Sequence, residues 1–356
     1  MSTTIWLRAE DKPFERRTPC VPGDAAKLIA AGYKVVVEAS DQRAIATEAY
    51  AAAGCEIADQ GSWRNAPKQA FILGLKELLE DTYPLQHRHI HFGHVFKGQP
   101  GAEQMLGRFK EGGGQLFDLE CLVDENGRRV AAFGHWAGYA GAAVAVAAWC
   151  GQQRGSEPSL GALSDYASCA QLTEELSRAL ADVSGRKPEA MVIGALGRSG
   201  GGAVALFEEL GLPVTKWDMA ETKSGGPFPE ILHHDLFINC VLLAPDCPPF
   251  LSKQTLAEPG RRLSVISDVS CDPGSAHNPL PIYDACTDFA EPTLRVTAGP
   301  PPVDLIAIDH LPSLLPLESS EDYSSQLIST LLTLDRPEDG VWGRALNVFN
   351  ENMKKV

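Results

Sequence analysis

Short apolar blocks alternate with amphipathic segments along the first part of this chain. Strands are expected at Trp6–Leu7, Tyr33–Glu38 and Phe71–Leu75, with helices at Asp24–Ala31 and Thr47–Ala53. A glycine follows each of these two helices, as is common at helix C-termini. The regular alternation of strand and helix predicts an α/β fold with a parallel sheet.

The same alternation returns in the second half of the chain. The strand Met191–Ile193 leads into a turn with Gly194, Gly197 and Gly200, and a helical segment, VALFEEL, follows. Further strands are expected at residues 214–217, 236–239 and 263–267. Glycines at such a turn let the backbone bend sharply, and they let a pyrophosphate approach the N–H groups at the start of the helix.

The order of strand, glycine turn and helix is typical of dinucleotide-binding folds, although the spacing here is G-x-x-G-x-x-G and not the stricter G-x-G-x-x-G. About 20 residues further on, Asp218 follows a short strand, where such folds place the acid that hydrogen-bonds a ribose 2′-hydroxyl. Because this negative charge would repel a 2′-phosphate, NAD is expected in preference to NADP.

The glycine turn also permits two other functions. Gly197 to Gly201 fits G-x-S-x-G, the nucleophile elbow of serine hydrolases, with Ser199 as nucleophile. The downstream acid and histidine of such a hydrolase would come from Asp235 or Asp268 and from His277 or His310. A catalytically silent NAD-binding sensor is the other alternative. Asp218 favours the nucleotide site over the hydrolase, because a hydrolase has no use for it.

The remaining segments predict helices. Val130–Cys150 is rich in Ala and Gly and contains His135 and Trp136, which favours a closely packed buried helix over a membrane span. An amphipathic helix is expected at about Ser164–Val183. Two helices at Glu321–Leu332 and Val341–Met353 are too short to form a domain, so they must pack against one already built.

Length, charge and cysteines narrow the class of protein. A chain of 356 residues suggests two domains. Its net charge of -15 argues against a nucleic-acid partner, which needs a basic surface. The nine cysteines lack any C-x-x-C pair, which fits free thiols in a reducing compartment. No signal-peptide core is present at the N-terminus, so the protein is expected in the cytoplasm.

Ionisable residues follow three of the expected strands. Lys76 and Glu77 follow FILGL, His94 follows HIHFG, and Glu120 follows QLFDL. Since ligands of open α/β sheets bind beyond the carboxyl ends of the strands, these groups could meet in one crevice. Each of them could equally be a solvated loop residue.

Three alternating histidines precede His94. His87, His89 and His91 fall on one face of a strand. No neighbouring acid or cysteine completes a ligand set, so a polar strand face is expected there and no metal site.

The whole chain resembles the NAD-dependent, lysine-forming saccharopine dehydrogenases. The segments that carry the resemblance occur in family order and span nearly the full length: LRAEDKPFERR, GSWRNAPK, GLKE, HIHFGHVFKGQ, DLE, GRRVAAFG, GALGRSGGGA, KWDMAET, INC, DVSCDPGSAHNPLPIY and IDHLPSLLP. A looser likeness, through the N-terminal βαβ segment, is to alanine dehydrogenase and transhydrogenase subunits.

The resemblance implies two Rossmann-like parallel-sheet domains with a cleft between them. The first, on the substrate side, is discontinuous and comprises residues 1–137 and 316–356; the second, residues 138–315, binds NAD. The implied reaction is the reversible oxidation of saccharopine to L-lysine and 2-oxoglutarate, in the aminoadipate route to lysine. A related opine or amino-acid dehydrogenase with another amine partner is the alternative.

The resemblance also implies roles for single residues. Lys76 and His94 match the family's acid/base pair, and Glu77 and Glu120 match the acids that tune it. The substrate side takes Arg17, Lys97, Phe133, Ser270, Cys271 and Asp272. The nucleotide side takes Gln99, Arg128, Gly197, Arg198, Asp218, Thr222, Val269, Ile308, Asp309, His310 and Leu311. No metal is implied.

Two departures from the family pattern leave this chemistry untouched. Some members carry a cysteine at the position of Ser199 that can pair with the one at Cys240, so that disulfide cannot form here. Some end in the peroxisomal tripeptide Ser-Lys-Leu, whereas this chain ends in MKKV. The sequence leaves the oligomeric state open, with a monomer as one interpretation.

Overall fold

The computed structural model describes residues 2–183, 185–242 and 248–356. The chain forms two compact units, of which the first joins residues up to Ala132 with Pro316–Val356 and the second is Phe133–Leu315. The boundary expected from the sequence, at 137/138, falls inside helix α4 (Gly134–Gln153), whereas the structure divides the chain just before this helix.

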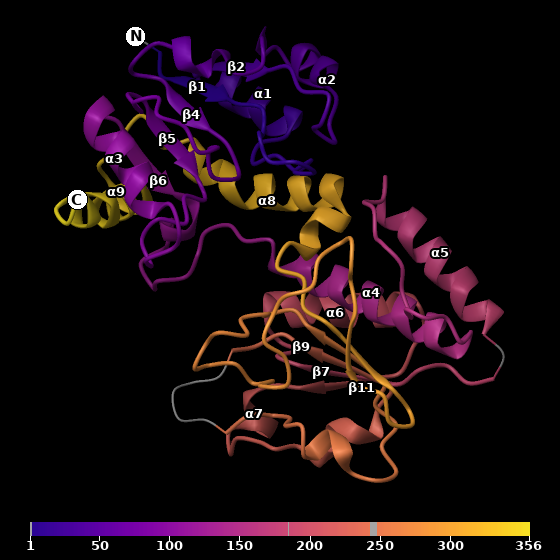
Figure 1. Cartoon of the computed structure of the whole chain (residues 1–356). Coiled ribbons are helices and arrows are strands. Elements are labelled where there is room, and N and C mark those ends of the chain that lie inside the picture. The colour runs from indigo at the N-terminus through magenta and orange to yellow at the C-terminus, as the bar shows by residue number, and fades with distance from the viewer. Residues whose placement is uncertain (1, 184, 243–247) are drawn as a thin grey trace. The chain divides into compact units, whose positions relative to one another are not determined.

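The first unit is built on a six-stranded sheet in which all the neighbouring strands are parallel, in the order β3-β2-β1-β4-β5-β6 (Figure 1). Its strands are β1 (Thr4–Leu7), β2 (Lys34–Glu38), β3 (Glu56–Ala58), β4 (Phe71–Leu73), β5 (Arg88–His91) and β6 (Gln115–Asp118). Its helices are α1 (Pro22–Ala30), α2 (Thr47–Ala52), α3 (Ala102–Gly112), α8 (Pro316–Leu331) and α9 (Gly340–Met353).

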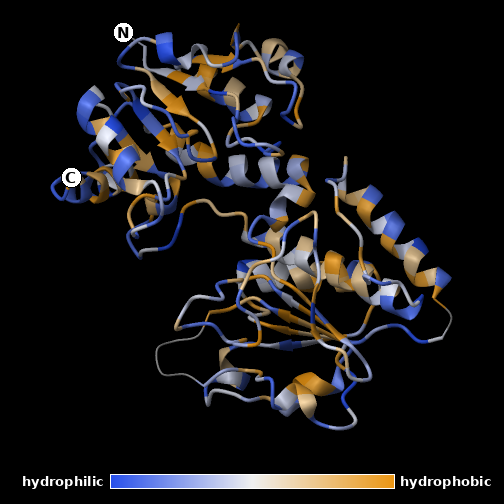
Figure 2. Ribbon diagram, viewed as in Figure 1, coloured by the Kyte–Doolittle hydropathy of each residue, from blue (hydrophilic) through white to orange (hydrophobic). Residues whose placement is uncertain are grey.

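Two strands of this sheet, β2 and β4, are apolar on both faces. All three residues of β4 are buried, as are Val35, Val36 and Val37 in β2, and these strands appear hydrophobic in Figure 2. Such continuous apolar strands are typical of parallel sheets with helices on both faces. The sequence pattern therefore predicted the strands here, although it did not reveal β3 or α3.

The C-terminal helices complete the first unit, as their length required. Trp342 of α9 is buried with its ring edge against Phe117 of β6, at 5.8 Å between centroids, and Phe349 meets Phe109 at 5.4 Å. From α8, the Ser320 hydroxyl accepts a 3.0 Å hydrogen bond from the Thr18 N–H. Contacts between residues more than 200 positions apart thus hold the two segments together.

The second unit has its own six-stranded sheet, in the order β11-β12-β10-β9-β7-β8. Only the β11–β12 pair is antiparallel among these described strands. The strands are β7 (Ala190–Ile193), β8 (Val214–Trp217), β9 (Leu236–Asn239), β10 (Val265–Asp268), β11 (Leu294–Thr297) and β12 (Val303–Ile306). The helices are α4, α5 (Cys169–Asp182), α6 (Arg198–Glu209) and the short α7 (Met219–Thr222).

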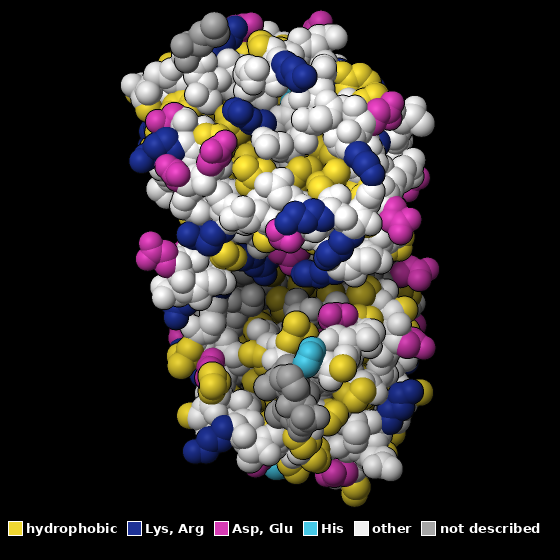
Figure 3. Space-filling view, turned by 90° about the vertical axis from the view of Figure 1, so that its left-hand side faces the viewer, with side chains coloured by type: hydrophobic (Ala, Val, Ile, Leu, Met, Phe, Trp, Pro, Cys, Tyr) yellow, Lys and Arg dark blue, Asp and Glu magenta, His cyan; other side chains and the backbone are white. Residues whose placement is uncertain are grey.

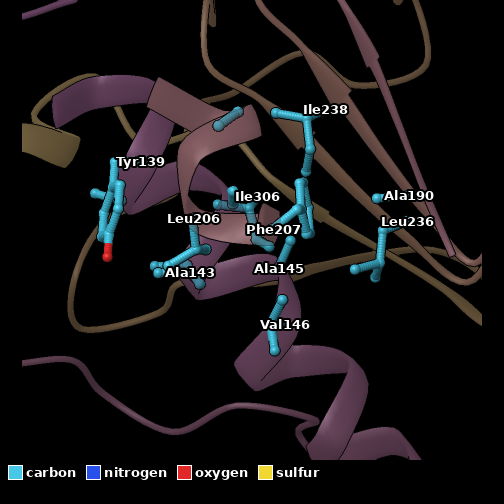
Figure 4. Packing of buried hydrophobic residues seen from close by; sticks show 14 of the residues in the cluster. Tyr139, Ala143, Ala145, Val146, Ala190, Leu206, Phe207, Leu236, Ile238 and Ile306 are labelled. Carbon is cyan, nitrogen blue, oxygen red and sulfur yellow. The ribbon is translucent and has the colours of Figure 1, made fainter. Parts of the chain in front are cut away.

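Helix α4 is the buried centre of the second unit, as its Ala and Gly content predicted. Ala143, Ala145 and Val146 pack with Leu206 and Phe207 of α6 (Figure 4). The helices approach so closely that a Cβ on Gly202 would overlap the carbonyl oxygen of His135. Among the described residues, no helix is long and apolar enough to cross a membrane.

Two helix boundaries differ from the sequence predictions, and the apolar segment 130–150 is helical only from Gly134 onward. Before this helix, Val130 N–H bonds to Leu122 O, and Ala132 bonds through its N–H and carbonyl to Gln326. Helix α5 begins after Ser168, whose side chain accepts from Gln171 N–H at 3.2 Å. Helix α6 begins at Arg198, so Gly200 to Gly202 are helical and not part of the turn.

The prediction of a polar strand face at the histidines is wrong. His87, His89 and His91 are fully buried, with exposures of 0%. The His89 ring meets the edges of Trp63 at 5.3 Å and Phe109 at 5.5 Å between centroids. An alternating polar pattern marks one strand face, but in this unit residues from η1 (Ser62–Asn65) and α3 cover that face.

The two sheets share one topological feature. The strand order reverses between β1 and β4 in the first unit and between β7 and β9 in the second. In open α/β sheets, ligands bind beyond the carboxyl ends of the strands at such a switch point. On the side of the molecule that Figure 3 shows, both units carry basic as well as acidic side chains.

Candidate active site

Lys76 lies beyond the carboxyl end of β4, beside the switch point of the first sheet. The backbone that carries it is held by Glu10, which follows the neighbouring strand β1. One Glu10 carboxylate oxygen accepts from Leu75 N–H at 2.6 Å, and the other accepts from Lys76 N–H at 2.9 Å. The buried Arg8 guanidinium donates to the Lys76 carbonyl and forms a 3.4 Å ion pair with Glu10.

Charged side chains surround Lys76. Arg17 is 4% exposed and donates to both carboxylate oxygens of Glu15, at 2.8 and 2.6 Å. Burial alone would raise the pKa of Glu15, but the charges of Arg17 and Lys76 and the hydrogen bonds from Arg17 lower it. Glu77 pairs with Lys12 at 2.9 Å. Burial opposes the ionisation of Glu77, yet Lys12 and Lys76 bring its pKa below the ordinary value.

His94 follows β5 in an uncommon backbone conformation. Its φ of 53° lies in the left-handed region, which few residues other than glycine adopt. The ring is exposed and stacks on Phe92, with 6.3 Å between centroids and 18° between planes. The preceding Gly93 N–H donates to Asp118 at 3.1 Å. The structure thus presents the imidazole to solvent from a backbone that a buried acid holds.

Glu120 lies on the same side of the first unit as His94. Its carboxylate pairs with the Lys97 ammonium at 2.9 Å. Burial raises the pKa of Glu120, but Lys97, Arg129 and His94 together lower it below the ordinary value. His94, Lys97, Gln99 and Glu120 line a cavity of about 330 Å³. The sequence predicted these four residues for the site, and the structure brings them together.

Gln99 and Arg128 of the first unit were both predicted for the nucleotide side, and the structure places them differently with respect to the cavity. Gln99 accepts from Lys97 N–H at 2.8 Å, so it shapes the cavity loop. Arg128 lies exposed in the turn after Asp124, which accepts from Arg128 N–H at 2.9 Å, and it does not line the cavity. The adjacent Arg129 does line it.

At the switch point of its sheet, the second unit has a glycine turn and a helix start, whereas the first unit has charged side chains there. The turn after β7 uses Gly194 at φ 87°, and a Cβ on Gly200 would overlap the Gly194 carbonyl oxygen. Gly197 caps α6 without a side-chain hydrogen bond to the first turn. Gly197 and Arg198 are exposed. The start of α6 is therefore exposed beyond the switch point.

Asp218 lies beside this turn at the carboxyl end of β8. One carboxylate oxygen accepts from Leu196 N–H and the other from Met219 N–H, both at 2.9 Å. Thr222 donates its hydroxyl to the Asp218 carbonyl at 2.9 Å. The acid predicted from sequence spacing is thus bonded to the glycine turn itself, and its remaining lone pairs can accept hydroxyl donors.

These residues fit a bound NAD. The exposed start of α6 suits a pyrophosphate, and Gly200 of this helix packs so closely on the turn that a side chain there would overlap the Gly194 carbonyl oxygen. An ionised Asp218 suits ribose hydroxyls and opposes a 2′-phosphate.

Ser270, Cys271 and Asp272 follow β10 and are held by the buried Asp268. One Asp268 oxygen accepts from the Ser270 hydroxyl at 2.7 Å and from Cys271 N–H at 3.3 Å, and the other accepts from the Tyr283 hydroxyl at 2.8 Å. Cys271 has a positive φ of 24°. Asp272 is exposed and Val269 is half-buried.

The remaining predicted residues of the second unit divide by burial. Ile308 and Leu311 are 1% exposed and pack in the core, so only their backbone can contact a ligand. Asp309 is exposed and pairs with His310 at 2.7 Å. Phe133 lies half-buried at the N-terminus of α4.

The serine hydrolase alternative is not favoured by this geometry. Asp235 precedes β9, at the opposite end of the sheet from Ser199, and is bound by Arg186 and Arg262. Asp268 is occupied by Asn239, Ser270 and Tyr283. His310 pairs with Asp309 instead. Among the described hydrogen bonds, no histidine connects Ser199 to an acid.

Sequence reasoning missed several residues of the site, among them Glu10, Asp118, Cys121 and Arg129. Glu10 and Asp118 bind the backbones that carry Lys76 and His94, and Asp118, Cys121 and Arg129 line the cavity. Of these four, the last three stand within two positions of residues that the sequence did single out. Only Glu10 gave no local signal, because its partners lie 65 and 66 positions further along the chain.

Comparison with known proteins agrees with this organisation. Residues 6–140 match the family described as "Alanine dehydrogenase/PNT, N-terminal domain". A solved L-alanine dehydrogenase has a TM-score of 0.67 at 18% identity, over 98% of this chain and 93% of that one. This likeness shows the fold, and it confirms the predicted pair of Rossmann-like α/β domains.

Two curated relatives extend over nearly the whole chain. The saccharopine dehydrogenase (NAD(+), L-lysine-forming) of Emericella nidulans is 47% identical over 366 residues, which cover 99% of this chain and 98% of the relative. The enzyme of that name from Neurospora crassa is 46% identical over 361 residues, which cover 99% of this chain and 96% of the relative. The chain therefore belongs to the saccharopine dehydrogenase (NAD(+), L-lysine-forming) family.

Proposed function

We propose that this chain catalyses the reversible, NAD-dependent conversion of saccharopine and water to L-lysine and 2-oxoglutarate, with formation of NADH and a proton. The observation that carries the proposal is the presence of Lys76 and His94 beyond neighbouring strands of one unit, in a chain that matches lysine-forming saccharopine dehydrogenases along its full length. The second unit supplies the groups that suit a dinucleotide.

Bound NAD supplies the oxidant, because its nicotinamide can accept a hydride from the carbon next to the secondary amine. On the protein side, the N–H groups at the start of α6 are proposed to hold the pyrophosphate, with Arg198 beside them. Asp218 is proposed to accept hydroxyl donors of the ribose, while Thr222 supports Asp218 through its carbonyl. Val269 and the segment 308–311 are further proposed contacts.

Lys76 and His94 are proposed to move the protons. Oxidation of the secondary amine releases its proton, and a neutral Lys76 amine can accept it. Hydrolysis of the resulting imine then requires a base for the attacking water and an acid for the departing lysine nitrogen, and an exposed imidazole can serve in both ways. Glu77 and Glu120 are proposed to tune these groups through their charges.

Saccharopine carries three carboxylates, so the site of an acidic protein needs local cations. We assign this role to Arg17, Lys97 and Arg129. The Arg17 guanidinium already binds Glu15 in two-point fashion, so its contribution to substrate binding is proposed to be made together with Glu15. Phe133 and residues 270–272 are proposed to complete the substrate contacts.

The reaction can be tested by following NADH consumption with 2-oxoglutarate and a panel of amines. We expect oxidation with lysine, little with ornithine, and a strong preference for NADH over NADPH. Oxidation with ornithine or another amino acid in place of lysine would support the alternative, an opine or amino-acid dehydrogenase with a different partner. Binding of NADH without oxidation by any amine would contradict both and indicate a sensor.

The cysteine thiols support a proposal for the compartment in which the enzyme works. All the described cysteines are free, which suits the reducing conditions of the cytoplasm. We propose that the protein works there as a monomer, which gel filtration with light scattering would test.

A further inference from the structure

A buried acid binds the backbone of two segments of the site, the one that carries His94 and the one that carries Glu120. Asp118, at the end of β6, is 2% exposed. One of its oxygens accepts from Gly93 N–H at 3.1 Å, and the other accepts from Glu120 N–H at 2.8 Å. A Cβ on Gly93 would come within 3.1 Å of the same carboxylate. A single carboxylate therefore fixes the peptide before His94 and the start of the segment that carries Glu120.

The loop that carries Lys76 is held in the same way. Glu10 is 9% exposed, and its two oxygens accept from Leu75 N–H at 2.6 Å and Lys76 N–H at 2.9 Å. Arg8 donates to the carbonyl of Lys76, so the peptide groups on both sides of this residue are bound. Glu10 follows β1, which is the strand next to β4, just as Asp118 ends β6, which is the strand next to β5.

The energetics of these acids differ from those of ordinary stabilising carboxylates. Burial raises the pKa of Asp118, although hydrogen bonds from Glu120 and Gly93 oppose this effect. Burial likewise raises the pKa of Glu10, against the influence of Arg8. The folded protein thus disfavours the charge on each acid relative to water, so ionised Glu10 and Asp118 do not add to stability through their charge.

The backbone conformation at His94 shows the effect of the hydrogen bonds to Asp118. A left-handed conformation at a residue other than glycine is uncommon, and it persists where surrounding contacts fix it. The Gly93 to Asp118 bond lies immediately before that residue. Because Glu120 and His94 both depend on Asp118, their spacing is set by one rigid group and not by two independent loops.

We propose that Glu10 and Asp118 are positioning residues that fix the loops of Lys76 and His94 in the geometry required for proton transfer. This inference rests on the proposed function of Lys76 and His94. Neither acid is a catalytic residue, since each acts through backbone N–H groups. In both cases a buried carboxylate at the end of an adjacent strand accepts a backbone N–H of the loop. Glu10 accepts two such bonds from the Lys76 loop. Asp118 accepts one from Gly93 and a second from Glu120 in its own segment.

The variants Glu10→Gln and Asp118→Asn test the proposal, because an amide keeps the size of the acid but replaces one acceptor oxygen with a donor. One of the two backbone bonds must then be lost. We expect kcat to fall about 10- to 100-fold, as misplaced reacting groups do. The KM values for lysine and 2-oxoglutarate should change less than about threefold, since no substrate contact is removed.

A matched control is Asp235→Asn in the second unit. Asp235 is also buried and accepts a backbone bond, from Glu189 N–H at 2.9 Å, but it lies at the amino end of its strand. It should lower the melting temperature without changing kcat. If Glu10→Gln and Asp118→Asn behave like Asp235→Asn, with a lower melting temperature and an unchanged kcat, the acids are structural and the proposal is overturned.

Crystal structures of the variants separate this proposal from the proposed function. We expect the His94 backbone to leave the left-handed region in Asp118→Asn, and the Leu75–Lys76 peptide to rotate in Glu10→Gln. Unchanged loops in both variants would overturn the proposal even if the wild-type enzyme acts on lysine. If the wild-type protein shows no lysine-dependent NADH oxidation, the proposed function fails, while these structures still decide whether the acids hold the loops. Should one variant fail to fold, the other tests the same device.

Discussion

The two units place their chemistry at equivalent points of similar sheets but use different parts of the chain. In the first unit, buried Arg8, Glu10, Glu15 and Arg17 surround a lysine beyond the end of β4. In the second, the turn after β7 offers backbone N–H groups, with Asp218 as the acid hydrogen-bonded to it. The functional groups at a switch point can therefore come from side chains or from the backbone.

The difference follows from what each unit is proposed to hold. Proton transfer needs groups that gain and lose protons, and these must be kept in place by buried partners. A pyrophosphate needs only converging N–H donors and space, which glycines and a helix start provide. Substitutions should therefore act through charge and position in the first unit, and through added volume in the second.

The variant Lys76→Met should give the largest effect and should distinguish the proposed roles of the two units most clearly. Removing the amine should lower kcat by about 10²- to 10⁴-fold, the usual size of a general acid–base contribution. NADH binding, followed by fluorescence, should not change. Lys68→Met, at an exposed position of the same unit, is the control and should leave kcat unaltered. A loss of NADH binding in Lys76→Met would show that the division between the units is wrong.

The second unit should respond to a single methyl group. In Gly200→Ala the new Cβ would overlap the Gly194 carbonyl oxygen, so the turn must shift. We expect destabilisation of about 1–3 kcal/mol, as for overpacking elsewhere, and a loss of NADH affinity.

The adjacent Gly201→Ala is a matched control, because its Cβ meets nothing within 4 Å. In a helix interior, Ala is favoured over Gly by up to about 1 kcal/mol. The control should bind NADH normally and melt at the same temperature or slightly higher. Equal losses in the two variants would show that overlap with the Gly194 carbonyl oxygen is not the cause of the loss in Gly200→Ala.

Acid should destabilise the first unit through its buried histidines. Burial and the neighbouring histidines place the pKa of His89 well below its ordinary value. Below the ordinary value of about 6.5, the unfolded chain binds a proton that folded His89 does not, so stability falls as pH decreases. Between pH 6.5 and 5, one such histidine costs up to about 2 kcal/mol.

Denaturant unfolding of His89→Phe over this pH range checks the assignment. The variant should lose stability less steeply on acidification than the wild type. Substitution of the exposed His233 by Gln should leave the slope unchanged. Parallel slopes in the wild type and His89→Phe would mean that His89 takes up its proton in the folded protein.

The smallest expected effect is that of Glu120→Gln. Removing this negative charge should disfavour protonation of the proposed proton-transfer pair, so the pH–rate profile should move to lower pH. Because the Glu120 side chain is 34% exposed and paired with Lys97, solvent screening should limit the shift to less than about one unit. An unmoved profile would contradict a tuning role for Glu120.

The sequence predicted much of the fold because buried parallel strands are locally apolar. It identified most of the strands of both sheets, the buried helix α4 and the C-terminal helices. It missed β3, α3, β11 and β12, whose short or mixed patterns are weak local signals. It placed the start of α5 too early, because tertiary bonds from Leu163 and Tyr166 keep the preceding segment extended.

The sequence by itself determined the nucleotide turn, Asp218, and the position of Lys76, His94 and Glu120 after successive strands. These depend on local order along the chain, which residue spacing records directly. Only the tertiary structure decided that three alternating histidines are buried, that Arg17 is bound to Glu15, and that Glu10 and Asp118 hold the Lys76 and His94 loops. Burial and pairing depend on which segments fold over one another, and a pattern within one segment does not contain that information.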